Sequence, residues 1–396
     1  MEDSELRLTR GVSTAELERR WSAVRAEMKK RSIDYLVIQN SEEYLGGTIR
    51  WFTDFTARHQ FPMTVIFPVD EEMTTIVCGV DPPGDNWPPP YASHGIRNRL
   101  GAVYFSTIQY TNTYEGERAV TVLKMKKHAT IGLVERAFIP VTFHEYLVDH
   151  LPDSNFVDAT DWLDEIRVPK SPEEIELIKG TAAIQDACAE ELKNIIRPGK
   201  RDLDVYAEAH CFLSKLGSER GLVQIGSGPQ GTIVPFDVPR FQNRVIQDGD
   251  QVSVLIEVNG PGGYYTEILR VYVVGKPPIR ALQDAAGAAL EAQDMTARNL
   301  VTGADPKQLW ADFRNFCIQR GYFPPGRSFS HGQGQSLVDR PNLRPDEVWK
   351  IRPGMNMAVH PVMVMKQAFC PCGDNYMTTA NGAERLHKYP RKITVI

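Results

Sequence analysis

Long hydrophobic runs are missing from this sequence of 396 residues. No stretch is long enough to span a bilayer, and residues 1–20 lack the apolar core of a signal peptide. An excess of charge is also missing, because 45 Lys and Arg face 50 Asp and Glu for a formal charge of -5. We therefore expect no binding to nucleic acid or to a membrane, and a cytoplasmic location.

Cysteine is scarce as well. The six cysteines are scattered, apart from Cys370 and Cys372, which excludes a disulfide framework and fits a reducing compartment. The hydrophobic content of 42% is ordinary for a globular protein, and the length predicts two domains.

The first domain, residues 1–168, is predicted to be α/β. An amphipathic helix pattern over 15–31 leads into an apolar run, 33–39, that is typical of a buried strand. Further strand patterns and two helix patterns share the region up to about Arg167. The strand patterns occupy 63–69, 74–80 and 129–135, and the helix patterns occupy 143–151 and 159–167.

A helix start marks the boundary to the second domain, residues 169–396. Ser171 is a good N-cap and Pro172 suits the first helical turn, so a long helix is predicted to about Ile196. An amphipathic pattern over 202–217 predicts a second helix. The Gly- and Pro-rich stretch 225–239 is predicted to be a loop that lines a cleft or a dimer contact.

The segment Gly249–Val274 predicts a β-hairpin that carries two acidic residues among apolar ones. Alternating apolar residues indicate a strand on each side of the turn Asn259–Gly263, so Glu257 and Glu267 flank this turn. Carboxylates are costly to bury unless a cation, a metal or a proton partner accompanies them. The pair therefore indicates chemistry, although a solvated face is the alternative.

The order of the motifs resembles the creatinase, prolidase and aminopeptidase P family over nearly the whole chain. These motifs are KSPEEIELIK, an SGP segment, GYYTEILR, SHGQG, AVHP and NGAERL. The resemblance implies an α+β pita-bread fold, with a cleft between two similar halves in residues 170–396 and a smaller N-terminal domain. It also implies a homodimer that acts on a small-molecule substrate.

Metallopeptidases of this family hold two divalent metals, and the resemblance places several of their ligand positions in the hairpin and in SHGQG. Relatives carry two Asp in the hairpin. Glu267 occupies the second Asp position, and the first falls at Leu255 or, in a shifted alignment, at Glu257. His331 retains the family histidine of SHGQG.

The remaining ligand positions are altered. His360 replaces the family Glu that precedes Pro, and the C-terminal Glu position falls at Gly373, beside Asp374. Losing these carboxylates removes the negative charge that holds two dications together, so a standard dinuclear peptidase site is not expected.

Two interpretations of the altered site remain open: no cofactor, or a single divalent metal. Two imidazoles with one or two carboxylates match the ligand preferences of zinc or iron. A His beside a Glu is also an acid and base pair without any metal, a route for which creatinase is the precedent. The candidate catalytic residues, which are also the ligands if a metal is bound, are His331, His360, Glu257 and Glu267.

Further residues are candidates for substrate binding, although packing and turn roles are the alternatives. They are Tyr264, Tyr265, Asp237, Asp339 and Asp374. Arg270, where relatives also carry Arg, is expected to form a structural ion pair.

The function expected from these features is hydrolysis of a C–N bond, of amide or amidine type, in a small polar amino-acid-like substrate. One alternative is a metal-dependent lyase that resembles the dimethylsulfoniopropionate lyases, whose two acidic hairpin positions are spaced like Glu257 and Glu267. The others are an Xaa-Pro peptidase with a remodelled site and a binding protein on an inactive peptidase fold.

Overall fold

The computed structural model describes residues 8–396, except 43, 56–60, 82–93, 237–242 and 325. The chain divides into two compact units. One spans Gly11–Arg167, and the other spans Val168–Ile396 together with residues 8–10.

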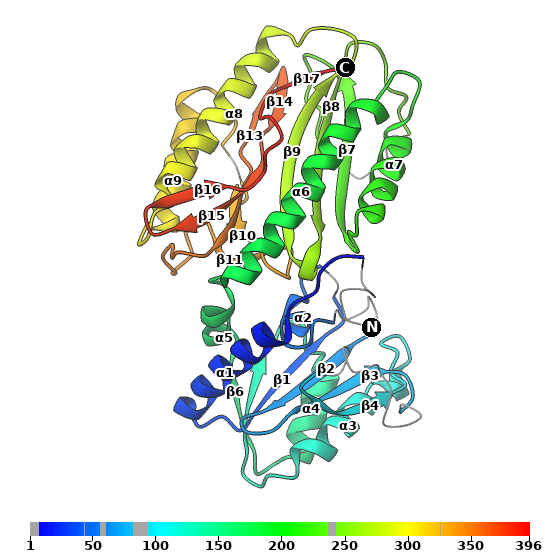
Figure 1. Ribbon diagram of the computed structural model, residues 1–396, viewed down its shortest axis with the longest axis vertical. Helices are drawn as coiled ribbons and strands as arrows, with labels where there is room; N and C mark the ends of the chain where they lie inside the picture. Colours follow the sequence, from blue (N-terminus) through cyan, green and yellow to red (C-terminus); the bar gives the residue numbers. More distant parts are fainter. Residues whose placement is uncertain (1–7, 43, 56–60, 82–93, 237–242, 325) are drawn as a thin grey trace. The chain divides into compact units, whose positions relative to one another are not determined.

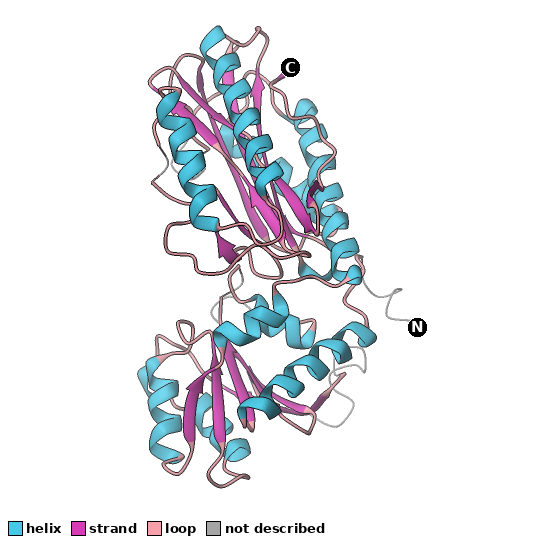
Figure 2. Cartoon of the chain, turned by 90° about the vertical axis from the view of Figure 1, so that its left-hand side faces the viewer, coloured by secondary structure: helices cyan, strands magenta, loops and turns pink. Residues whose placement is uncertain are grey.

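Within the described residues, the first unit contains a mixed six-stranded sheet in the order β4-β3-β2-β1-β5-β6 (Figure 1). Figure 2 shows helices on both faces of this sheet. The strands are β1 (Tyr35–Asn40), β2 (Met63–Pro68), β3 (Met73–Cys78), β4 (Ile96–Ala102), β5 (Thr130–Val134) and β6 (Asn155–Asp158). The helices are α1 (Thr14–Arg31), α2 (Gly47–Thr53), α3 (Tyr114–Leu123), α4 (Val141–His150) and α5 (Thr160–Arg167).

The second unit begins with a helix pair packed on one sheet. Helix α6 (Pro172–Ile195) starts as expected, since the Ser171 side chain accepts from the Glu174 backbone N–H at the N-terminus. With α7 (Asp202–Lys215) it packs on the sheet of order β17-β9-β8-β7 (Figure 1). The strands are β7 (Gly221–Pro229), β8 (Asp250–Asn259), β9 (Tyr265–Val273) and β17 (Thr394–Val395).

A second helix pair and sheet complete this unit. Helices α8 (Arg280–Asn299) and α9 (Pro306–Gln319) share an apolar core with the sheet of order β11-β10-β12-β15-β16 and with the ribbon β13-β14. The strands are β10 (Ser330–Gly332), β11 (Asp339–Asn342), β12 (Asn356–Val359), β13 (Val362–Met365), β14 (Ala368–Pro371), β15 (Asp374–Thr379) and β16 (Gly382–Arg385). The unit therefore has the two similar halves that the resemblance implied.

The β8-β9 hairpin is confirmed and is more deeply buried than its alternating pattern indicated. Every residue of both strands is buried. One face of the hairpin packs against α6 and α7, and a backbone bridge between Leu269 and Gly373 joins β9 to the second half. Because both faces are covered, polar side chains in these strands must find partners inside the protein.

The prediction of a loop over 225–239 was wrong for its first part. Residues 225–229 belong to β7, which pairs antiparallel with β8. The glycines of this segment allow another part of the backbone to come close, because a Cβ on Gly226 would lie 1.9 Å from the Pro235 carbonyl oxygen.

Among the described helices, none combines the length and the apolar character that crossing a membrane requires.

One carboxyl group of the first unit is buried without a cation. Glu115, on α3, is 2% exposed and accepts hydrogen bonds from Gln39 Nε2 at 2.7 Å and Thr64 Oγ1 at 2.6 Å. Burial raises the pKa of Glu115 to about 7, and the two hydrogen bonds only partly oppose this shift. Glu115 therefore keeps its proton in the folded chain at pH values where the unfolded chain has lost it.

This difference makes stability depend on pH. Between about pH 4.5 and 7 the folded state binds more protons than the unfolded state, so the free energy of unfolding falls as pH rises. We expect the free energy of unfolding of wild type to fall by up to about 3 kcal/mol across this window because of Glu115. The variant Glu115→Gln should lack this fall. Urea unfolding of wild type and variant at pH 5, 6, 7 and 8 measures it. Identical pH dependence in the two proteins would contradict the assignment.

Candidate active site

The β8-β9 hairpin places its two carboxyl groups side by side. Glu257 and Glu267 are direct partners in the antiparallel register, and their exposed fractions are 5% and 3%. Side chains of directly opposed residues point to the same face of a sheet. The two acids therefore meet on one face of the buried hairpin.

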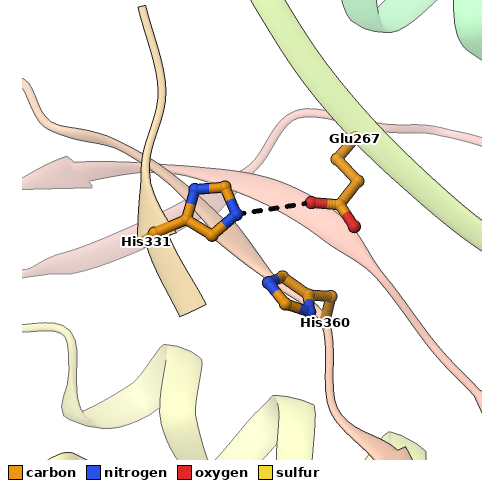
Figure 3. Close-up of side chains that lie close together, drawn as sticks. All are labelled: Glu267, His331 and His360. Carbon is orange, nitrogen blue, oxygen red and sulfur yellow. Dashed lines mark ion pairs between the residues drawn. The ribbon is translucent and has the colours of Figure 1, made fainter. Parts of the chain in front are cut away.

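Two histidines from the other half approach this pair, and Figure 3 shows them beside Glu267. His331 lies on β10 and His360 directly follows β12, a strand that pairs with β10. Their ring centroids are 5.2 Å apart, and His331 Nε2 lies 3.8 Å from Glu267 Oε2. Both histidine residues are 6% exposed. The structure thus brings all four predicted catalytic residues together.

These four side chains line one cavity of about 510 Å³ in the second unit. Most of the other lining side chains are aliphatic or aromatic. The lining residues are Leu222, Gln224, Phe236, Leu255, Glu257, Glu267, Leu269, Phe313, Phe323, Pro324, Gly326, Arg327, Ser328, Phe329, His331, Leu337, Val338, His360, Val362, Val364 and Phe369. An apolar cavity with a few convergent polar groups is the common form of a ligand site.

Hydrogen bonding leaves three atoms of the cluster available as metal ligands. His331 Nδ1 donates to the Gly332 carbonyl oxygen at 3.0 Å, which leaves Nε2 with a free lone pair. Among the described residues, the buried atoms Glu267 Oε2 and His360 Nε2 have no hydrogen-bond partner. The ligand atoms that Glu267, His331 and His360 offer lie within 4.8 Å of one another. The set therefore fits one divalent metal.

A chain of amides holds the two acids in place. Gln333 Nε2 donates to Glu257 Oε1 at 2.7 Å, and Gln333 Oε1 accepts from Asn375 Nδ2 at 2.8 Å. Asn375 Oδ1 accepts in turn from the backbone N–H of Glu267 at 2.6 Å. Sequence reasoning missed Gln333 and Asn375. The signal for Gln333 is its place in the motif SHGQG, two residues after His331 and directly after the end of β10.

Burial disfavours every charge in this cluster. It raises the pKa of Glu267 to about 8, and burial together with the neighbouring Glu267 raises the pKa of Glu257 well above its ordinary value. It lowers the pKa of His331 to about 4, and that of His360 well below its ordinary range. The imidazoles are thus neutral, as metal ligands must be, and a cation would favour ionised carboxylates.

Four of the five predicted substrate-binding residues are described, and none of these four lines the cavity. The Tyr264 hydroxyl donates to Glu174 Oε1 at 2.6 Å, and Tyr265 is a buried residue of β9. Asp339 lies 3.6 Å from the Lys170 ammonium group. Asp237 lies outside the described residues.

Asp374 belongs to a separate buried ion cluster. Arg270 forms the expected structural ion pair with it at 2.7 Å, and Arg385 donates to the same oxygen at 2.9 Å. The two nearby cysteines are unreactive, because their thiols stay protonated. Burial raises the pKa of Cys370, and it raises that of Cys372 to about 12. These groups support the fold around the site and do not face the cavity.

Comparisons with known proteins agree with this architecture. Residues 176–382 match the model of metallopeptidase family M24, and residues 20–168 match the creatinase/prolidase N-terminal domain. The chain belongs to metallopeptidase family M24. The resemblance found in the motifs and the predicted pita-bread fold class are thereby confirmed.

Relatives of this M24 chain carry peptidase names. An uncharacterized hydrolase/peptidase of Sinorhizobium fredii is 27% identical over 96% of this chain and 97% of its own length. An Xaa-Pro dipeptidase of Pyrococcus horikoshii is 26% identical over 75% and 87%. The crystal structure of an X-Pro aminopeptidase from Thermotoga maritima superimposes with a TM-score of 0.76 at 20% identity, over 95% of this chain and 99% of that one. This structural likeness concerns the fold.

The position implied for the C-terminal family Glu is closed by packing. A Cβ on Gly373 would lie 2.3 Å from Leu269 Cδ1 and 3.1 Å from Leu269 Cβ. Backbone hydrogen bonds of 3.1 and 3.3 Å hold the two residues together. Leu269 thus occupies the space that a longer side chain at 373 needs. The described residues therefore fit one metal and do not fit the dinuclear set.

We expect the metal-free chain to bind one equivalent of Zn²⁺ tightly in a calorimetric titration. Glu267→Gln and His360→Ala should each weaken this binding by more than about 100-fold, because each removes a ligand. His210→Ala, on helix α7 and away from the cavity, is the matched control and should bind as wild type does. Two tight equivalents, or unchanged binding in both ligand variants, would contradict the one-metal site.

Proposed function

We propose that the chain is a one-metal hydrolase that cleaves a C–N bond of amide or amidine type. This proposal rests on three side chains that converge on one cavity, Glu267, His331 and His360. The carboxyl group of Glu257 lies beside them in the same cavity. A two-histidine, one-carboxylate set is also found in hydrolytic zinc enzymes, where it leaves one coordination position open. A divalent metal bound there would polarise the scissile group and lower the pKa of a water molecule.

Glu257 is the group that we assign to proton transfer. It is not needed as a ligand, it lines the cavity, and the amide of Gln333 fixes its orientation. As a base it takes a proton from the attacking water, and as an acid it passes that proton to the leaving nitrogen. Its raised pKa suits a group that must hold the proton between these two steps.

The side chains that line the cavity indicate which kind of substrate fits it. The sequence led us to expect a small polar substrate, whereas the aromatic and aliphatic lining favours one with a hydrocarbon part. Such walls also exclude water from the reacting groups, which strengthens their electrostatic interactions. Homodimer formation, which the family resemblance implied, stays a prediction.

A second candidate function is cleavage of Xaa-Pro dipeptides. The name of the Pyrococcus horikoshii relative, an Xaa-Pro dipeptidase, favours it. The altered ligand set argues against a mechanism that requires two metals. A panel that contains Xaa-Pro dipeptides, N-acyl amino acids and amidines separates the two candidates. Incorporation of ¹⁸O from labelled water separates hydrolysis from the elimination that a lyase would catalyse.

We expect His331→Ala and His360→Ala each to lower kcat/KM on the best panel substrate by at least about 1000-fold. Circular dichroism and the unfolding midpoint should show that both variants remain folded. His210→Ala serves again as the control and should retain wild-type activity. Retention of activity in both cavity variants would reject the proposed site.

A further inference from the structure

A third buried histidine of the second unit lies outside the cavity. His387 follows β16, is 2% exposed and does not line the cavity. Its ring nitrogen Nδ1 accepts a hydrogen bond from the Asn375 backbone N–H at 3.1 Å, and Nε2 lies 3.0 Å from Gln185 Oε1. His387 therefore joins strand β15, which carries Asn375, to helix α6, which carries Gln185.

The partners of His387 fix the position of its ring proton. Gln185 Nε2 donates to the carbonyl oxygens of Val258 at 3.1 Å and Thr266 at 2.5 Å, so Gln185 Oε1 is the acceptor end of this amide. His387 Nε2 therefore donates to it, and Nδ1 is left as the acceptor for the Asn375 N–H. Burial lowers the pKa of His387 to about 3, which keeps the ring neutral in this arrangement.

Through Gln185, the histidine is tied to the backbone of the reactive hairpin. Val258 directly follows Glu257 in β8, and the Val258 carbonyl is one of the two that Gln185 binds. Thr266, which carries the other, directly precedes Glu267 in β9. Gln185 is fully buried, so water cannot replace a partner that this amide loses.

Through Asn375, the histidine is tied to the carboxyl groups themselves. Asn375 begins the chain of amides that passes through Gln333 to the carboxyl group of Glu257. Residues 386 and 387 hold both backbone groups of Asn375, because the Leu386 N–H donates to its carbonyl oxygen at 2.8 Å and His387 accepts from its N–H. A displaced Asn375 therefore shifts the amide chain at its start.

We propose that His387 is a positioning residue that fixes the carboxyl group of Glu257 through Asn375. Its second contact, to Gln185, holds the ring in place for this role. The inference rests on the proposed hydrolase function and adds a residue that acts on the site without touching the substrate. Glu257 must reach both the attacking water and the leaving nitrogen, so loss of its fixed orientation lowers kcat more than it weakens substrate binding.

Two substitutions separate the two contacts of His387. In His387→Asn the side-chain oxygen takes the place of Nδ1 and accepts from the Asn375 N–H, but the side chain is too short to reach Gln185. In His387→Gln the amide nitrogen takes the place of Nε2 and donates to Gln185, while the Asn375 N–H loses its acceptor. The first variant keeps the contact that leads to Glu257, and the second removes it.

We expect His387→Gln to lower kcat on the best panel substrate about 10- to 100-fold, with KM within about 3-fold of wild type. His387→Asn should lower kcat by less than about 3-fold. Both variants should bind one equivalent of zinc within about 3-fold of the wild-type affinity, because the three ligand side chains remain. His210→Gln, the same change on helix α7 and away from the cavity, is the control and should match wild type throughout.

Crystal structures of the two zinc-loaded variants give a readout that is independent of turnover. The hydrogen bond from Gln333 Nε2 to Glu257 Oε1 should persist in His387→Asn and be lost in His387→Gln. An unmoved Glu257 carboxyl group in His387→Gln, or equal kcat in the two variants, would overturn the proposal. Loss of folding or of zinc binding in His387→Gln would also overturn it, because the histidine would then support the fold as a whole.

The two readouts separate this proposal from the proposed function. If the Glu257 carboxyl group moves as expected while wild type hydrolyses no substrate of the panel, the hydrolase function fails and the positioning role of His387 stands. If wild type is active and His387→Gln is as active with Glu257 unmoved, the positioning role fails and the function stands.

Discussion

The direct pairing of Glu257 with Glu267 across the β8-β9 hairpin is the constraint on which the site depends. Two carboxyl groups that share one buried face cannot both ionise without a compensating positive charge. The chain supplies Arg327 at the cavity lining and two neutral imidazoles, but the described residues place no cation in contact with Glu267 Oε2. A divalent metal ion bound there would resolve this imbalance, and the orientations of His331 and Glu267 suit such an ion.

Loss of the second metal position is a matter of packing as well as of ligands. Leu269 and Gly373 face each other across a backbone bridge, and a side chain at 373 would collide with the leucine side chain. A glutamate there therefore requires the Leu269 side chain to move. In the proposed site Glu257 is not a ligand, so one hairpin would supply both a metal ligand, Glu267, and a separate acid and base.

The sequence predicted the elements that depend on local patterns and on motif order. These include the hairpin, the capped start of α6, and His331 and His360, which the motifs SHGQG and AVHP identify. It could not show the contacts that depend on long-range packing. Tyr264 reaches α6, and Asp374 is enclosed by Arg270 and Arg385, because each finds its partner in a segment distant in sequence.

The same limit explains the residues that went unnoticed. Gln333 and Asn375 act through a hydrogen-bonded chain whose members lie far apart in the sequence. Anomalous diffraction from a crystal of the zinc-loaded protein would locate the metal directly. A one-metal site predicts one zinc peak bounded by Glu267, His331 and His360, with Glu257 uncoordinated. Two adjacent peaks, or a peak away from these side chains, would contradict it.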